Sequence, residues 1–238
     1  MFKEFIPYND QEIGLEGFIA YPSKEKQPTV VLCHAWNGRD EYICQQAQLI
    51  AGWGYAAFAI DIYGKGVLGK SPKENADLKQ PFLSDRNLLK QRIIKGYETI
   101  CTHPFIDETN MVVIGFGFGG VCALDFARYI KTLKGAISVY GHFEPPNKTA
   151  NQLIKSKVLL LHGYDDPIVT MDELLQFQEE LSANAVDWQT HLYSQSMHAF
   201  TTPSANSPEL GIAYNQLSTK RAWKTIRNFV DEVLQPSS

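Results

Sequence analysis

The sequence predicts an α/β fold, with a doubly wound, mostly parallel sheet, an antiparallel strand pair at the N-terminus and helices on both faces. Short apolar, β-branched runs alternate with longer segments of helical periodicity along the chain. Several of these runs end in loops rich in glycine and aspartate, as strands do at the carboxyl edge of a parallel sheet. No internal repeat, low-complexity segment or linker interrupts the alternation. We therefore expect residues 1–238 to form a single domain without a large cap domain.

Composition narrows the class of protein. The 238 residues are 44% hydrophobic and 20% charged, which suits a globular domain with a large core. A net charge of −4 and a pI near 5.9 give no reason to expect nucleic acid or a membrane surface as a partner. The mixed-charge start, residues 1–7, does not resemble a signal peptide, and no apolar run approaches the ~20 residues of a membrane span.

The cysteines indicate a reducing compartment. They are scattered, with no Cys-x-x-Cys pair, at Cys33, Cys44, Cys101 and Cys122. This spacing argues against a zinc site and fits reduced thiols in the cytoplasm.

The first half of the chain is expected to form a strand pair and then a strand–helix–strand unit. The pair spans residues 2–7 and 13–21 and is joined through residues 9–11. The unit comprises a strand at 28–34, a helix at 40–52 and a strand at 55–61, and its crossover should be right-handed.

The middle and the C-terminal half continue the alternation. The polar segment from Asp61 to about Pro81 is interpreted as a loop, and a helix over 83–100 is expected to begin at Ser84 as its N-cap. Further strands are expected at 111–114, 135–140, 157–162 and 186–193, and further helices after 117, at 171–181 and at 214–233.

The stretch Gly115-Phe116-Gly117-Phe118-Gly119 follows the strand at 111–114 and precedes a helical pattern. A strand, a very tight turn and a helix form the frame of a nucleophile elbow, G-x-Nuc-x-G, in which the flanking glycines allow strand and helix to pass closely. The central position normally carries Ser or Cys, but here it carries Gly117. The sequence therefore predicts the frame of a hydrolase site without its nucleophile.

Two later residues complete the order of a catalytic triad. Asp166 follows the strand at 157–162, and His198 lies in the loop after the next strand. An acid in this place would fix the imidazole tautomer and stabilise its charged form. The alternatives are that Asp166 is a turn or N-cap residue beside Pro167, and that His198 is an ordinary loop histidine. Asp165 is less well placed relative to Gly163, and three other histidines near strand ends are interpreted as structural: His34, His142 and His162.

An oxyanion hole is predicted from backbone atoms alone. Such a hole combines the backbone N–H of the residue after the elbow centre with an N–H from the loop that follows an earlier strand. In this sequence the two residues are Phe118 and Trp36. The alternative is that Trp36 only packs its loop. Tyr63 lies at a strand end, where it could bind substrate or polarise a carbonyl, but a phenol of pKa ~10 is a poor nucleophile. Cys33 and Cys122 are interpreted as core residues.

Together, these motifs resemble the dienelactone hydrolase family over nearly the whole chain. The motifs, in the order in which that family has them, are His34-Ala35-Trp36-Asn37-Gly38, Asp61-Ile62-Tyr63-Gly64, Gly115-Phe116-Gly117-Phe118-Gly119-Gly120, Gly163-Tyr164-Asp165-Asp166-Pro167 and Met197-His198-Ala199-Phe200. The resemblance implies an α/β-hydrolase fold, no metal, no cofactor, and a Cys-His-Asp triad that opens lactones or cleaves esters.

The resemblance also marks two departures. His198 and Asp166 match the triad histidine and acid, whereas Gly117 falls on the cysteine. Ala35 falls at the substrate pocket, where the best-known members have a glutamate that controls the thiol.

Three functional hypotheses follow. The first is a hydrolase of small esters or lactones, monomeric or homodimeric, in which Gly117 is an introduced knock-out or a loss offset by direct attack of water. The second is a non-catalytic relative that binds a small ligand in the inherited pocket. The third is a scaffold or interaction protein.

Overall fold

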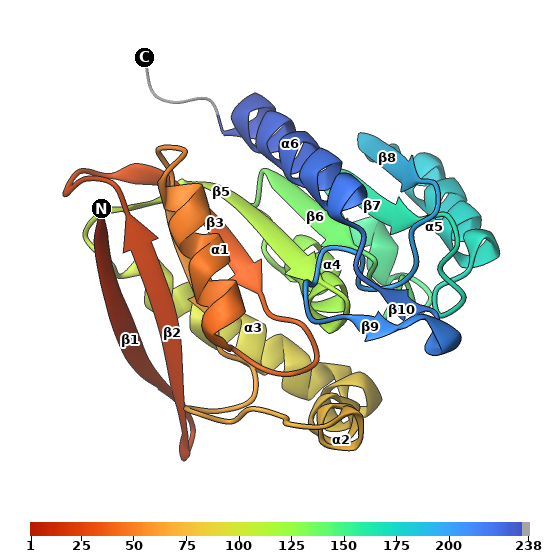
Figure 1. Cartoon of the computed structure of the whole chain (residues 1–238). Helices are drawn as coiled ribbons and strands as arrows, with labels where there is room; N and C mark the ends of the chain where they lie inside the picture. The colour runs from red at the N-terminus through yellow and green to blue at the C-terminus, as the bar shows by residue number, and fades with distance from the viewer. Residues whose placement is uncertain (235–238) are drawn as a thin grey trace.

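One sheet organises the molecule in the computed structural model, which describes residues 1–234 (Figure 1). Its strands are β1 (Phe2–Asp10), β2 (Ile13–Tyr21), β3 (Gln27–Cys33), β4 (Ala56–Ile60), β5 (Ile106–Phe116), β6 (Gly135–Val139), β7 (Lys157–Gly163) and β8 (Trp188–Tyr193). Their order is β1-β2-β4-β3-β5-β6-β7-β8. β2 runs antiparallel to both β1 and β4, and the remaining pairs are parallel. The expected mostly parallel sheet with an antiparallel N-terminal pair is confirmed.

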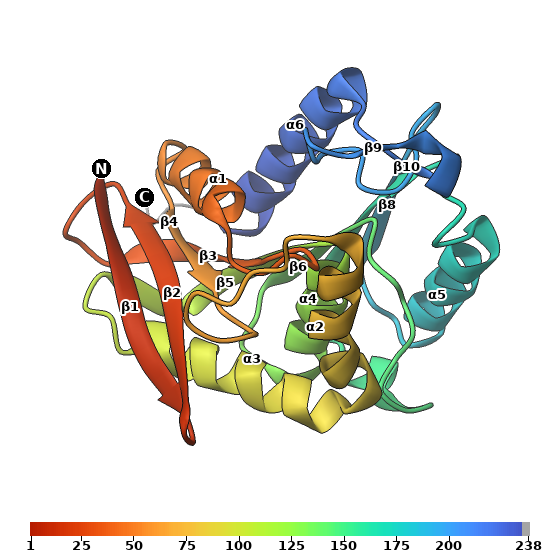
Figure 2. The same ribbon diagram turned by 60° about the horizontal axis from the view of Figure 1, so that its bottom comes forward.

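Helices cover both faces of the sheet, as predicted (Figure 2). They are α1 (Glu41–Ala51), α2 (Pro72–Ser84), α3 (Arg86–Cys101), α4 (Phe118–Tyr129), α5 (Met171–Ala183) and α6 (Gln216–Val233). Apolar side chains of α1 and α6 share one core cluster, and those of α3, α4 and α5 share another. β5 lies between the clusters, with Val113 in one and its neighbours Val112 and Ile114 in the other, because successive strand side chains point to opposite faces.

The interpretation of residues 61–81 as a loop holds for 61–71 but was wrong for 72–81, which belong to α2. The Ser71 hydroxyl caps the helix by accepting from the Glu74 N–H, and Pro72 fits the first turn, where a missing N–H costs nothing. Pro81 lies inside the helix, and few of the helix side chains are buried, so neither composition nor apolar periodicity indicated it. Ser84 ends α2, and Asp85 caps α3 in the place predicted for Ser84.

Smaller differences concern the boundaries of elements. β5 begins at Ile106, before the apolar run, because its first residues pair with Gln27 across a register shift. A two-stranded ribbon of β9 (Asn206–Ser207) and β10 (Ile212–Ala213) follows His198 and was not predicted. Two short 3-10 helices, η1 (Ala150–Leu153) and η2 (Pro208–Leu210), lie in connecting segments.

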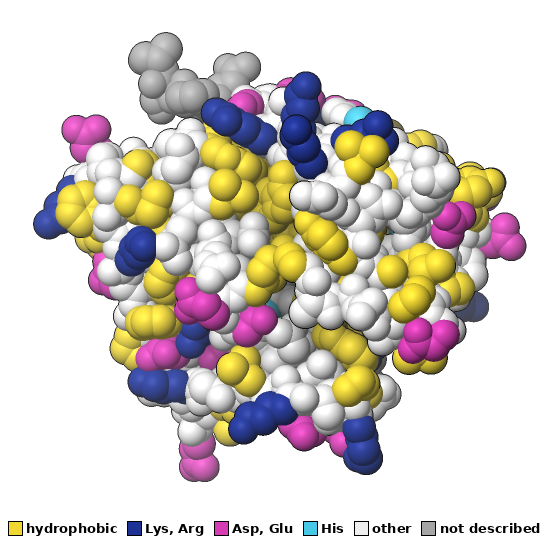
Figure 3. Space-filling model, viewed as in Figure 1, with side chains coloured by type: hydrophobic (Ala, Val, Ile, Leu, Met, Phe, Trp, Pro, Cys, Tyr) yellow, Lys and Arg dark blue, Asp and Glu magenta, His cyan; other side chains and the backbone are white. Residues whose placement is uncertain are grey.

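The surface is mixed in charge. Figure 3 shows acidic and basic side chains interspersed on the face that it draws. Among residues 1–234, no helix combines the length and the apolar character needed to cross a membrane.

Candidate active site

The turn between β5 and α4 has the geometry of a nucleophile elbow. Gly117 has a φ of 54° and a ψ of −112°, and its N–H donates to the Val139 carbonyl over 2.9 Å. A Cβ on Gly115 would lie 1.7 Å from the Gly119 carbonyl oxygen, and one on Gly119 would lie 2.2 Å from the Cys33 carbonyl oxygen. The flanking glycines are therefore required by the close approach of the strand and the helix.

A side chain at the elbow centre would have room. A Cβ built on Gly117 would lie 3.7 Å from His198 Nε2 and 3.6 Å from Tyr140 Cε2, which are ordinary van der Waals distances. The missing side chain would therefore point toward the imidazole of His198. We call this space the Gly117 gap.

His198 and Asp166 form a hydrogen-bonded pair beside the gap. His198 Nδ1 lies 2.8 Å from Asp166 Oδ2, so the imidazole donates through Nδ1 and keeps the Nε2 lone pair for the gap. The other carboxylate oxygen accepts from the N–H groups of Ile168 and Val169 at 2.8 and 3.0 Å. Asp166 thus also closes the turn that the alternative interpretation assigned to it.

The environment keeps Asp166 ionised. Burial raises the pKa of this carboxyl, but the hydrogen bond and charge of His198 and the two backbone N–H donors outweigh burial and leave the pKa below its ordinary value. A carboxylate in this position fixes the tautomer of the paired imidazole and stabilises the imidazolium that forms when the ring takes a proton.

The loop that carries His198 is held on both sides. The His198 N–H donates to the Gly211 carbonyl over 2.9 Å, and the Ala213 N–H donates to the His198 carbonyl over 3.1 Å. These bonds tie the histidine to the β9–β10 ribbon and fix where its ring can point.

Two backbone donors are available for an oxyanion. Phe118 is the first residue of α4, where N–H groups have no acceptor within the helix. The Trp36 N–H donates no hydrogen bond within the part of the chain that the structure describes. The first turn of α4 packs on the end of β3, since a Cβ on Gly119 would lie 2.6 Å from the His34 carbonyl oxygen. This contact brings the Trp36 loop next to the start of the helix.

Tyr63 and Ala35 support this loop. The buried Tyr63 hydroxyl donates to the Trp36 carbonyl over 3.1 Å, and its ring stacks on Phe118 with centroids 5.7 Å apart. Burial raises the pKa of the Tyr63 phenol, which keeps it protonated. The Ala35 carbonyl accepts from His34 Nδ1 over 2.7 Å. Tyr63 and Ala35 therefore lie beside the two backbone donors, and the substrate-binding role predicted for them stays a prediction.

Two of the other histidines are structural in their contacts. His34 is buried, and its Nε2 accepts from the Ile62 N–H. His162 donates through Nε2 to the Val169 carbonyl over 2.9 Å. His142 differs from both, because its ring centroid lies 6.4 Å from that of His198. Burial, together with the charge of His198, lowers the pKa of His142, so this imidazole is neutral beside the pair.

Sequence reasoning missed three residues around the site: Tyr140, His142 and Lys79. Tyr140 and His142 directly follow β6, so their place at the carboxyl edge was a usable signal. Tyr140 has a φ of 41°, bonds Thr201 Oγ1 over 2.7 Å and lies edge-on to His198. Lys79 comes from α2 and lies 5.5 Å from the centroid of the Trp36 ring; the loop interpretation of α2 concealed it.

Cys122 and Cys33 do not replace the missing nucleophile. Cys122 and Cys33 are completely buried, and burial raises the pKa of each thiol well above its ordinary range. They are core residues, as predicted.

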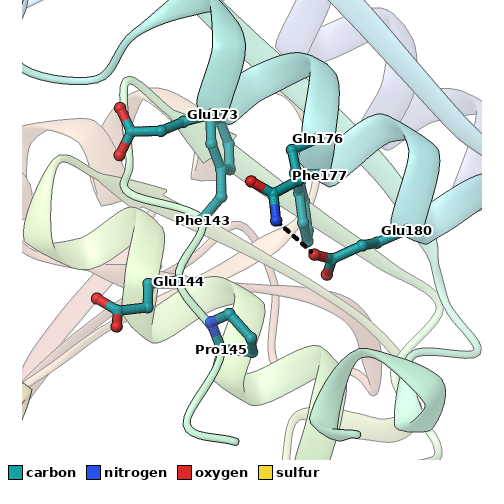
Figure 4. Close-up of a pocket in the computed structure, with 7 residues that line it drawn as sticks. All are labelled: Phe143, Glu144, Pro145, Glu173, Gln176, Phe177 and Glu180. Atoms are coloured by element: carbon teal, nitrogen blue, oxygen red, sulfur yellow. Dashed lines mark hydrogen bonds between the residues drawn. The ribbon is translucent and has the colours of Figure 1, made fainter. Parts of the chain in front are cut away.

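A separate hollow of about 250 Å³ lies between α5 and the segment after β6 (Figure 4). Two of its three carboxylates already have partners: Glu173 accepts from the Thr170 N–H in a capping box, and Glu180 accepts from Gln176 and Asn151. Neither Gly117 nor His198 lines this hollow, so it is not part of the candidate active site.

The sheet order, the glycine elbow, and the strand-end acid followed by a late histidine define an α/β hydrolase. The profile of the dienelactone hydrolase family matches residues 15–234, and the chain belongs to that family.

Individual relatives agree with this placement. The chain is 31% identical over 153 residues to an uncharacterized protein of Caenorhabditis elegans, K02A2.1, covering 63% of this chain and 97% of that protein. It is 24% identical over 246 residues to a probable 2-oxo-3-(5-oxofuran-2-ylidene)propanoate lactonase of Bradyrhizobium sp, covering 94% and 93% of the two chains. The crystal structure of the dienelactone hydrolase-like promiscuous phosphotriesterase P91, from metagenomic libraries, superposes with a TM-score of 0.91 at 26% identity and covers 98% of each chain.

Proposed function

We propose that this protein hydrolyses small esters or lactones by direct attack of a water molecule held in the Gly117 gap. The observation that carries the proposal is the intact His198–Asp166 pair, whose free Nε2 faces the gap at 3.7 Å from the position of a Cβ. A general base must lie within hydrogen-bond reach of the proton that it removes. A water oxygen that lies closer to His198 Nε2 than the Cβ position does would meet this requirement.

The reaction would proceed in one addition and one elimination. His198 Nε2 takes a proton from water as the oxygen attacks the substrate carbonyl carbon, and the Asp166 carboxylate stabilises the resulting imidazolium. The N–H groups of Phe118 and Trp36 donate to the oxyanion that forms, assisted by the positive end of the α4 dipole. The imidazolium then protonates the leaving alkoxide as the carbon–oxygen bond breaks. No acyl-enzyme forms, because residue 117 has no side chain.

Two further features support a small ester or lactone as substrate. The walls near the oxyanion donors are aromatic, with Phe82, Tyr63 and Phe118 in mutual contact, which suits a small and largely apolar molecule. The Bradyrhizobium relative is named as a lactonase.

The free cysteines support the cytoplasmic location that composition suggests.

Hydrolysis of p-nitrophenyl acetate and of a simple lactone by the unaltered chain tests the proposal. Serine proteases that have lost a triad member still accelerate hydrolysis ~10³–10⁴-fold over the reaction in water. We expect a rate enhancement of this size from the unaltered chain. His198→Ala should abolish it. The matched control His191→Ala, at an exposed histidine on β8, should leave the rate unchanged. Gly117→Cys and Gly117→Ser should hydrolyse faster if the rest of the site is intact.

The outcomes separate the hypotheses. Equal rates in the unaltered chain and His198→Ala would overturn water attack at this site. An inactive chain with an active Gly117→Cys variant would favour the second candidate, a ligand-binding pocket without turnover. The absence of a side chain at Gly117 is the one observation that favours that candidate.

A further inference from the structure

We propose that the Gly117 gap accepts a small external thiol, so that the site transfers the acyl group of an ester or lactone to sulfur and releases a thioester. The inference rests on the proposed function, because it uses the same base and the same oxyanion donors. It names a second substrate for the site, a thiol of a few heavy atoms.

The neighbours of the gap suit sulfur. Outside the adjacent residues of the chain, the three heavy atoms nearest to a Cβ position on Gly117 are Tyr140 Cε2, Tyr140 Cδ2 and His198 Nε2, at 3.6, 3.7 and 3.7 Å. Sulfur at the edge of an aromatic ring makes a favourable contact, and the Tyr140 ring presents its edge carbons here. The gap therefore offers a thiol a ring contact for its sulfur and a base for its proton.

The chemistry of the base favours a thiol in the same way. A cysteine-like thiol has a pKa of ~8.5, whereas the pKa of bulk water is far higher. His198, paired with the ionised Asp166, can therefore deprotonate a thiol at far lower cost than water. The thiolate is also the stronger nucleophile.

The chain offers no thiol of its own at this point. Cys122 and Cys33 are completely buried in the core behind the elbow. An external thiol would thus restore the sulfur that the elbow lacks, without forming a covalent bond to the protein.

The proposed step balances without an oxidant or a reductant. The thiol S–H proton moves to His198 Nε2 while a sulfur–carbon bond forms at the ester carbonyl, and the N–H groups of Phe118 and Trp36 hold the oxyanion. The carbonyl then re-forms, the carbon–oxygen bond to the alcohol breaks, and the imidazolium protonates the leaving alkoxide. Ester and thiol are consumed, and thioester and alcohol are released.

The test measures p-nitrophenol release from p-nitrophenyl acetate by the unaltered chain with increasing ethanethiol, after subtraction of the protein-free rate. Mass spectrometry quantifies S-ethyl thioacetate as the product. We expect a saturable increase of at least about tenfold over the rate without thiol, because a general base and a better nucleophile act together. Ethanol at the same concentrations should give no such increase.

Three controls place the chemistry in the gap. The branched 2-methyl-2-propanethiol carries two more methyl groups on the carbon next to sulfur, which would crowd Tyr140 and His198, and it should give much less protein-dependent acceleration than ethanethiol. His198→Gln should lower the protein-dependent thiolysis by about 10²-fold or more. Gly117→Ala would fill the gap with its Cβ and should abolish saturation by ethanethiol; the thiol-size series gives the same information on the unaltered chain.

Failure of this inference is distinguishable from failure of the proposed hydrolysis. Ethanethiol without effect on a chain that still hydrolyses the ester would overturn the inference and leave the hydrolase. His198-dependent thioester formation without hydrolysis in plain buffer would support the inference and overturn water attack. The inference would be overturned if the branched thiol accelerated the reaction as much as ethanethiol does. It would also be overturned if ethanethiol accelerated the His198→Gln variant as much as the unaltered chain.

Discussion

Gly117 combines an open neighbourhood with a backbone conformation that few other residues adopt. Its φ of 54° lies in the region that favours glycine, although a Cβ there would meet nothing closer than 3.6 Å. Tyr140, which lies against the gap, also has a positive φ, of 41°. Two neighbouring residues in sparsely populated conformations at one point are typical of a functional site, where surrounding structure holds the strain. The glycine at position 117 lowers that strain, and it also leaves the elbow without a nucleophile.

The first prediction concerns this strain. Gly117→Cys should lower the free energy of unfolding by ~1–3 kcal/mol, because the new residue must adopt a positive φ. Urea denaturation of the two proteins at the same pH measures the difference. An unchanged or raised free energy of unfolding in the variant would show that the elbow is not strained.

At the scale of elements, α4 connects the elbow to a buried polar network. Asp125 and Arg128 lie on this helix with fully buried side chains and form an ion pair at 2.7 Å. Arg86, in the first turn of α3, adds a two-pronged contact to the same carboxylate, and Asn151 accepts from Arg128. The network fixes the helix whose first N–H groups face the candidate active site.

The second prediction concerns Asp125. Asp125→Ala should lower the free energy of unfolding by about 3–5 kcal/mol, because it leaves the Arg128 guanidinium buried without its counter-ion. Chemical denaturation checks the value. The matched control is Asp77→Ala, which removes the exposed partner of Lys73 on α2 and should leave stability essentially unchanged. Similar losses in both variants would argue against a special role for burial.

At the scale of the whole molecule, the site exists because separate loops meet at one edge of the sheet. The ends of β3, β5, β7 and β8 deliver the Trp36 loop, the elbow, Asp166 and His198. Parallel strands share this edge, so residues far apart in sequence become neighbours there. The same topology buries several histidines just beneath the edge. Burial lowers the pKa of His34, His142 and His162.

The third prediction follows from those pKa shifts. In the unfolded chain these histidines take up protons near their ordinary pKa of about 6.5, whereas the folded chain does so only at lower pH. The unfolded state therefore binds more protons below that pH, and the free energy of unfolding should fall as pH is lowered from about 7 to about 5.

Urea denaturation at several pH values measures this dependence. His142→Asn should reduce the slope, whereas the same change at the exposed His191 should leave it nearly as it is. A flat profile between those pH values would contradict the prediction.

Local sequence was sufficient for the fold class and for the frame of the site. The spacing of Gly115, Gly119 and Gly120 predicts a tight strand–helix turn, because each glycine corresponds to a contact that no Cβ could occupy. The order of Asp166 and His198 after the elbow identified the pair that the structure joins by a hydrogen bond. Where local patterning was weak, as in α2, prediction failed, because that helix buries little apolar surface and contains a proline.

The absence of a nucleophile at the elbow is evident from the sequence, because Gly117 has no side chain in any fold. The surroundings of this position depend on how the chain packs. Tyr140, His142 and Lys79 reach the site from β6 and α2, and no spacing along the chain encodes their distances from His198. Packing across the sheet edge sets those distances, because residues that are remote in sequence become neighbours only when the strands align.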